Sequence, residues 1–114
     1  MKKSVKKLWV KALRSGEYKQ GKYRLRDRHN KFCCLGVLCN LHAQAHPEFA
    51  AEQTRKIEYC GKTEVLPIEV IRWAGLDVPN PRVIDFDGIC INVASLNDEG
   101  RSFEYIAELI ERHL

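Results

Sequence analysis

The sequence has no hydrophobic run that approaches the roughly 20 residues a membrane-spanning helix requires. Its basic N-terminal residues are not followed by the apolar stretch of an export signal. Its five cysteines are an odd number, and no two of them have the Cys-x2-Cys spacing typical of structural zinc sites. We therefore expect a cytoplasmic protein with reduced thiols, without a disulfide framework, a cofactor or a membrane partner.

Repeats, low-complexity tracts and linkers are also lacking, which argues against a modular or disordered chain. The composition, 45% hydrophobic and 30% charged, is that of an ordinary globular protein. A chain of 114 residues has enough apolar side chains for one core. We expect residues 1–114 to form a single domain.

Apolar periodicity predicts helices and strands in alternation. Helices are expected at residues 4–15, with Ser4 as the N-terminal cap, from Phe32 to His46, at 66–75 and from Ser102 to the C-terminus. Strands are expected at 22–26, 82–86 and 89–93, the last two joined by a tight Asp87-Gly88 turn. The prediction is an α+β fold in which a small antiparallel sheet of about three strands packs against three to four helices.

Positive charge is concentrated near the N-terminus, where residues 1–31 contain 12 Lys and Arg residues against Glu17 and Asp27. If 22–26 is a strand, Tyr23 and Leu25 face the core while Arg24 and Arg26 line the opposite face. The predicted ligand-binding residues are Lys22, Tyr23, Arg24, Arg26, Arg28 and Lys31. Arginines suit phosphates and tyrosines stack on bases, although a purely solvated basic face is about equally compatible with the pattern.

The run Phe32-Cys33-Cys34-Leu35-Gly36-Val37-Leu38-Cys39 begins the expected central helix. A thiol at a helix N-terminus can be activated as a nucleophile, so Cys33 and Cys34 are the candidates if the protein is a hydrolase or transferase. No histidine in the sequence is well placed to act as their base. Because cysteine is one of the most frequently buried residues, we predict that both belong to the core.

Cys39, His42 and His46 follow at helical spacing and would share one helix face, the geometry of a partial zinc site. The simpler interpretation places Cys39 in the core and the histidines on a half-exposed flank. Gly36 inside the same helix predicts a close approach by another element.

Two blocks of the sequence, Phe32-Cys33-Cys34-Leu35-Gly36-Val37-Leu38-Cys39 and Leu96-Asn97-Asp98-x-Gly100-x-x-Phe103-x-x-Ile106-Ala107, resemble a family of small uncharacterised proteins of tailed phages, prophages and some bacteria. The resemblance implies no activity and no site residue. It implies that the protein acts in the host cytoplasm, where small phage accessory proteins often interfere with host systems.

The leading functional hypothesis is a non-enzymatic accessory protein that binds an anionic partner, either a nucleotide-like molecule or a nucleic acid, through the basic N-terminal face. A Cys33- or Cys34-dependent enzyme is one alternative. The other is a protein-protein interaction module, for example with a host protein, acting through the acidic C-terminal helix. The sequence does not indicate an oligomeric state.

Overall fold

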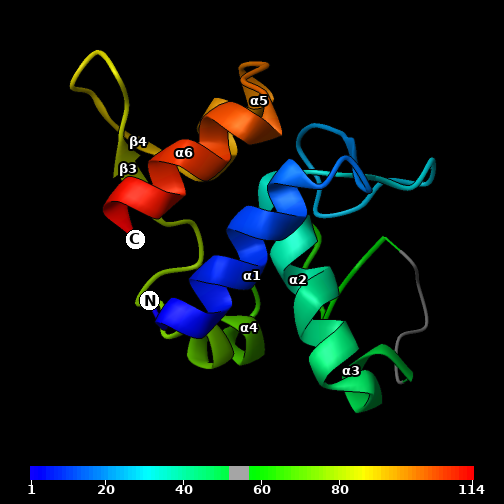
Figure 1. Ribbon diagram of the computed structural model, residues 1–114. Coiled ribbons are helices and arrows are strands. Elements are labelled where there is room, and N and C mark those ends of the chain that lie inside the picture. The colour runs from blue at the N-terminus through cyan, green and yellow to red at the C-terminus, as the bar shows by residue number, and fades with distance from the viewer. Residues whose placement is uncertain (52–56) are drawn as a thin grey trace.

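The computed structural model describes residues 1–51 and 57–114, apart from the side chain of residue 51, and in these residues the fold is α+β, as predicted (Figure 1). The elements are α1 (Lys3–Arg14), β1 (Lys19–Gln20), β2 (Lys31–Phe32), α2 (Cys34–Ala45), α3 (Pro47–Ala51), α4 (Ile68–Ala74), β3 (Arg82–Ile84), β4 (Cys90–Asn92), α5 (Val93–Asp98) and α6 (Phe103–His113). The buried hydrophobic residues of α1, α2, α4, α5 and α6 belong to one core cluster.

The first and last helices pack against each other along the core, and both were predicted. Trp9 of α1 and Ile106 of α6 are fully buried. The predicted cap of α6 is confirmed, because the Ser102 hydroxyl accepts a hydrogen bond from the Tyr105 amide. The predicted Ser4 cap of α1 is wrong: the helix begins at Lys3, and the Lys2 amide is instead bonded to the Ala74 carbonyl of α4 at 2.8 Å.

Helix α2 lies at the centre of the molecule and contacts α1, α3, α4 and α5. All of its residues from Cys34 to Cys39 are buried, and so is His42, which confirms the prediction of a central helix that is apolar on more than one side. Gly36 is the point of closest approach, since a side chain there would overlap the Leu25 carbonyl. The helix ends before His46 and Pro47, as predicted.

The predicted hairpin is confirmed: β3 and β4 are antiparallel, and Val83 pairs with Ile91. Its loop is longer than the two-residue turn that Asp87-Gly88 suggested. Asp85 forms the start of the loop: its carbonyl accepts the Gly88 amide, and its carboxylate accepts the amides of Asp87 and Ile89. Aspartate at the first position of a turn has this capacity because its side chain reaches the backbone two residues ahead.

Three predictions of secondary structure differ from the observed fold. Residues 22–26 are not a strand; Leu25 is buried as expected, but Tyr23 has a left-handed backbone with φ of 69° and is 66% exposed. Helix α5 occupies residues that were expected to end a strand and to form a polar connection, whereas the short α3 lies where the sequence is compatible with a surface loop or a weak helix. The described strands form two separate two-stranded sheets, and β1 with β2 is parallel. The predicted helix at 66–75 corresponds to α4, with both ends within two residues of the prediction, and Gly75 after its last turn has a left-handed backbone.

Candidate anion-binding site

A long connection between α1 and α2, residues 17–33, carries all six predicted ligand-binding side chains; we call it the basic loop. Leu25 anchors the middle of the basic loop to the core. The Leu25 side chain is 2% exposed, its amide donates to the Thr63 carbonyl at 2.7 Å, and its carbonyl lies against Gly36 of α2. The neighbouring Arg24 carbonyl accepts the Cys33 amide at 3.3 Å. The loop is therefore attached to the core between Arg24 and Arg26.

Asn97 of α5 holds the first part of the basic loop. This side chain is fully buried. Its Oδ1 accepts hydrogen bonds from Gln20 Nε2 at 3.0 Å and from the Cys34 amide at 3.2 Å, and its Nδ2 donates to the Gly21 carbonyl at 2.8 Å. One amide group thus joins α5, the start of α2 and the loop. The sequence around Asn97 is typical of a polar connection between elements and gives no indication of this role.

Asp27 organises the tip of the basic loop. Its Oδ1 accepts the backbone amides of His29 and Lys31 at 2.8 and 3.0 Å, and these bonds lower the pKa of the Asp27 carboxyl, first through the Lys31 amide. Asn30 adopts a left-handed conformation in the same turn. The tip is therefore a defined turn closed by an ionised carboxylate.

The predicted ligand-binding side chains do not share one face, because the strand that would have aligned them is absent. Arg24 and Arg28 line a hollow of about 260 Å³ with Asp27. Arg26 is absent from the lining of this hollow and lines a different cavity. Tyr23 borders a third, together with Cys33 and Asp98.

The remaining two predicted residues, Lys22 and Lys31, are exposed and line none of these three cavities among the described residues. Lys22 extends toward Gly100. Lys31 is paired with Lys19 across β1 and β2.

The cavity beside Arg26, which we call the Arg26 pocket, has a volume of about 620 Å³. Three groups that bear or can acquire positive charge line it: Lys19, Arg26 and His29. Glu17 is the one carboxylate among its described lining residues. Lys19 and His29 lie outside the set predicted from the sequence, and they reach the pocket because β1 and the Asp27 turn bring both ends of the loop together.

The Arg26 guanidinium is held in a fixed orientation. Its Nε and Nη2 both donate to Asn30 Oδ1, at 2.9 and 2.7 Å, and its central carbon lies 5.2 Å from the centre of the Phe32 ring. The Phe32 ring in turn meets Tyr18 edge to face at 5.2 Å, and the Tyr18 hydroxyl accepts a hydrogen bond from Asn40 of α2 at 2.7 Å. The pocket therefore combines an oriented guanidinium with an aromatic wall that is anchored to a core helix.

The two candidate nucleophiles are buried, as the core interpretation predicted. Cys33 is 2% exposed and Cys34 is fully buried. Burial raises the pKa of the Cys33 thiol to about 11 and that of Cys34 well above its usual value. The amides of Leu35 and Gly36 act in the opposite direction at Cys33 but are outweighed. Neither thiol has the lowered pKa that activates a cysteine nucleophile.

Cys39 is buried in the core, as the simpler interpretation predicted, and the rings of His42 and His46 both lie close to Phe49 and Trp73. His42 is 2% exposed, which corrects the prediction that it lies on a half-exposed flank, and its Nδ1 is 2.6 Å from the Tyr59 hydroxyl. Burial lowers the pKa of His42. His46 is half-buried, and its Nδ1 is 3.4 Å from Glu48. Among residues 1–51 and 57–114, no three His, Cys, Asp or Glu side chains are grouped so that they could hold a metal ion.

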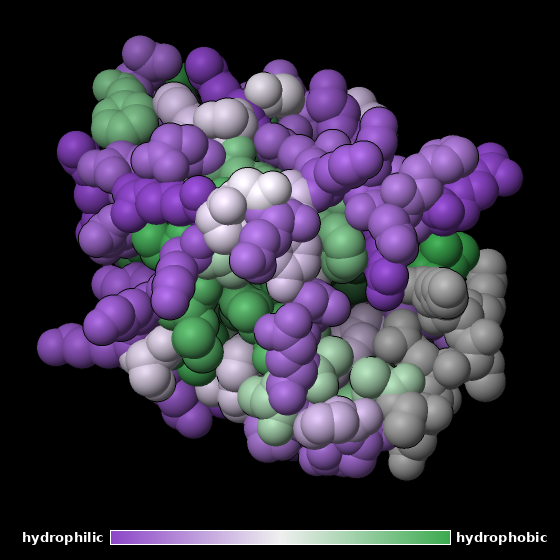
Figure 2. Space-filling view, turned by 45° about the vertical axis from the view of Figure 1, so that its right-hand side comes forward, coloured by the Kyte–Doolittle hydropathy of each residue, from purple (hydrophilic) through white to green (hydrophobic). Residues whose placement is uncertain are grey.

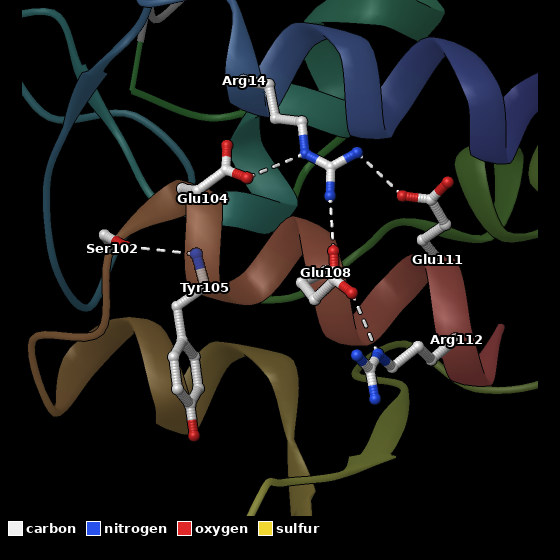
Figure 3. Close-up of polar contacts among 7 residues, drawn as sticks. All are labelled: Arg14, Ser102, Glu104, Tyr105, Glu108, Glu111 and Arg112. Carbon is white, nitrogen blue, oxygen red and sulfur yellow. Dashed lines mark hydrogen bonds and ion pairs between the residues drawn. The ribbon is translucent and has the colours of Figure 1, made fainter.

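The acidic residues of α6 contact a basic residue of the same chain (Figure 3). The Arg14 guanidinium at the end of α1 donates to Glu104, Glu108 and Glu111 at 3.1, 2.8 and 2.7 Å. Glu108 also accepts from Arg112 at 3.0 Å. Much of the negative charge that was considered for a partner is therefore already paired within the fold.

The molecular surface in one view is predominantly hydrophilic, with hydrophobic side chains visible mainly between charged ones (Figure 2). In the described part of the chain, no helix combines the length and apolarity needed to cross a bilayer.

The family model described as a domain of unknown function, DUF8296, matches residues 1–114. No curated protein and no solved structure matches the chain.

Proposed function

We propose that this chain, which belongs to the DUF8296 family over its whole length, binds a small phosphate-bearing ligand in the Arg26 pocket without transforming it. The observation that carries the proposal is the convergence of Lys19, Arg26 and His29 on one cavity of about 620 Å³. The accessory role in a phage setting, implied by the resemblance of the sequence, remains a prediction.

The chemistry of the pocket supports an oxyanion ligand. A guanidinium and an ammonium group form strong, charge-assisted hydrogen bonds with phosphate oxygens, and an imidazole adds a further donor. Arg26 is already oriented by Asn30, so less conformational freedom is lost when it binds. Glu17 leaves the pocket with a modest positive charge that suits a ligand of low charge.

A small ligand is favoured over a nucleic acid because the basic side chains diverge. A nucleic-acid groove needs cations spaced along a continuous path that follows the phosphate backbone. Arg24 and Arg28 line a different hollow from Arg26, so this loop offers separate pockets and not one path.

The test is a titration of the 15N-labelled protein with inorganic phosphate at low ionic strength, followed by NMR. We expect the largest shift changes at Lys19, Arg26 and His29. Arg26→Gln should weaken binding about tenfold or more, because a hydrogen bond to a charged group contributes about 1.5–3 kcal/mol.

Arg24→Gln is the matched control, since it removes the same charge from the same loop but from a different hollow. It should change the affinity by less than about twofold, through long-range electrostatics alone. Equal losses in the two variants would mean that the loop attracts anions only by its total charge, and the proposed pocket would be rejected.

A further inference from the structure

A second cavity adjoins the Arg26 pocket. It has a volume of about 90 Å³, and three residues that line it, Arg26, Phe32 and Asn40, also line the Arg26 pocket. We call it the Tyr59 pocket, after a tyrosine that lines this cavity but not the Arg26 pocket. Because the two cavities share these walls, a ligand held at Arg26 has a place beside it for a second chemical group.

The Tyr59 pocket is bounded on one side by α2. Gly36 and Ala43 of this helix line it, and their small size leaves room between α2 and the basic loop. Gly36 is required there by the approach of Leu25, so the same contact that fixes the loop also shapes this cavity. Since one water needs about 10–15 Å³ on this scale, the volume accommodates roughly six to nine atoms of that size, or about one six-membered ring.

The walls of the Tyr59 pocket combine flat rings with hydrogen-bonding groups. Phe32 and Tyr59 supply the rings, and Asn40 and Glu58 supply an amide and a carboxylate. The Tyr59 hydroxyl is engaged by His42 at 2.6 Å, and burial raises the pKa of Tyr59, so its ring remains a neutral wall. Asn40 Nδ2 already donates to the Tyr18 hydroxyl, so the Asn40 carbonyl oxygen and the Glu58 carboxylate are the hydrogen-bond acceptors that this cavity offers to the N–H groups of a planar nitrogen heterocycle.

We infer that the ligand is a pyrimidine nucleoside monophosphate, with its phosphate in the Arg26 pocket and its base in the Tyr59 pocket. This inference rests on the proposed function and adds the identity of the second group. A single phosphate matches a pocket whose formal cations, Lys19 and Arg26, are partly offset by Glu17. A one-ring base matches the smaller cavity.

Calorimetric titration with cytidine 5′-monophosphate, uridine 5′-monophosphate and ribose 5-phosphate tests the inference. The three compounds share the sugar phosphate and differ in the base. We expect the two nucleotides to bind about tenfold more tightly than ribose 5-phosphate, because a stacked and hydrogen-bonded base adds affinity. Adenosine 5′-monophosphate, with its two-ring base, should bind less tightly than the pyrimidine nucleotides.

Two matched variants of α2 locate the base. Ala43→Leu fills the Tyr59 pocket and should reduce the affinity for both pyrimidine nucleotides to that for ribose 5-phosphate, while leaving the latter unchanged. Ala45→Leu adds the same atoms at an exposed position of the same helix and should leave the tenfold preference intact.

The outcomes separate the inference from the proposed function. If ribose 5-phosphate binds as tightly as the pyrimidine nucleotides, or if Ala43→Leu keeps their preference, the base is not held in the Tyr59 pocket and the inference is overturned while phosphate binding stands. Tighter binding of adenosine 5′-monophosphate overturns the one-ring assignment. If none of the four compounds binds, the proposed function itself fails.

Discussion

Replacing Gly36 with alanine probes the contact that positions the basic loop. Gly36 lies within α2, where alanine is intrinsically favoured over glycine by about 1 kcal/mol. If α2 were free on this side, Gly36→Ala would therefore stabilise the protein. The structure predicts the opposite sign, because a Cβ atom at position 36 would lie 1.6 Å from the Leu25 carbonyl oxygen and 2.5 Å from its carbon.

The size of the destabilisation follows from the distance that the Leu25 carbonyl must move. Ordinary contacts of a Cβ atom are 3.4–4 Å long, so the Leu25 carbonyl has to retreat by about 2 Å, and no flexible side-chain end can absorb that shift. Overpacking of this kind costs about 1–3 kcal/mol, and loss of the Leu25 hydrogen bond to Thr63 adds about 1–3 kcal/mol. After the gain in helix propensity, we expect the free energy of unfolding to fall by about 3 kcal/mol.

Urea unfolding followed by circular dichroism measures this change as a shift in the midpoint. The pair Gln44→Ala and Gln44→Gly, at an exposed position of α2, calibrates helix propensity in the same helix and should differ by about 1 kcal/mol in favour of alanine. A Gly36→Ala variant as stable as the wild type, or more stable, would refute the close approach of Leu25 and with it the placement of the basic loop.

Three further predictions concern strain, thiols and pH. Tyr23→Gly should raise the free energy of unfolding by about 0.5–1 kcal/mol, because glycine relieves the left-handed backbone, whereas Tyr23→Ala should not stabilise; chemical denaturation distinguishes them. Timed alkylation at pH 8 with peptide mapping should label the exposed Cys90 more than tenfold faster than Cys33, because the Cys33 pKa of about 11 leaves roughly one thiol in a thousand ionised. Equal labelling rates would contradict the burial of Cys33. The pKa of His42 is lowered in the folded state, so the unfolded chain binds a proton there more readily, and the free energy of unfolding should fall as the pH drops below the unfolded pKa of about 6.5. In His42→Gln, the slope of the free energy of unfolding against pH between pH 7 and 5 should be smaller. An unchanged slope would count against a buried neutral imidazole.

The parts of the fold that could be predicted are those set by local patterns. The stripe containing Trp9, the cap at Ser102 and the apolar run from Cys34 determine α1, α6 and α2 through contacts within a few residues. Gly36 was also informative, since a glycine inside an apolar helix predicts a close approach by another element, and Leu25 makes that approach.

The basic loop could not be predicted because long-range contacts determine it. Alternation over 22–26 matched a strand, but the loop takes its path from Asn97, which lies more than 70 residues away in the sequence. Asn97 has no local signal, since an asparagine next to Asp98 and before a glycine is also typical of an exposed turn. The predicted set of ligand-binding residues shows the same effect: it includes Arg26 but not Lys19 or His29, because only the folded loop brings these three side chains to the same pocket.

The most direct test of the central claim compares two double variants of the basic loop by calorimetric titration with inorganic phosphate at low salt. Lys19→Gln/Arg26→Gln removes the two formal cations of the Arg26 pocket, and Lys22→Gln/Arg24→Gln removes the same two charge types from other sides of the loop. We predict that the first abolishes measurable binding while the second retains the wild-type affinity to within about threefold. Equal affinities in the two double variants would contradict the assignment of phosphate binding to the Arg26 pocket.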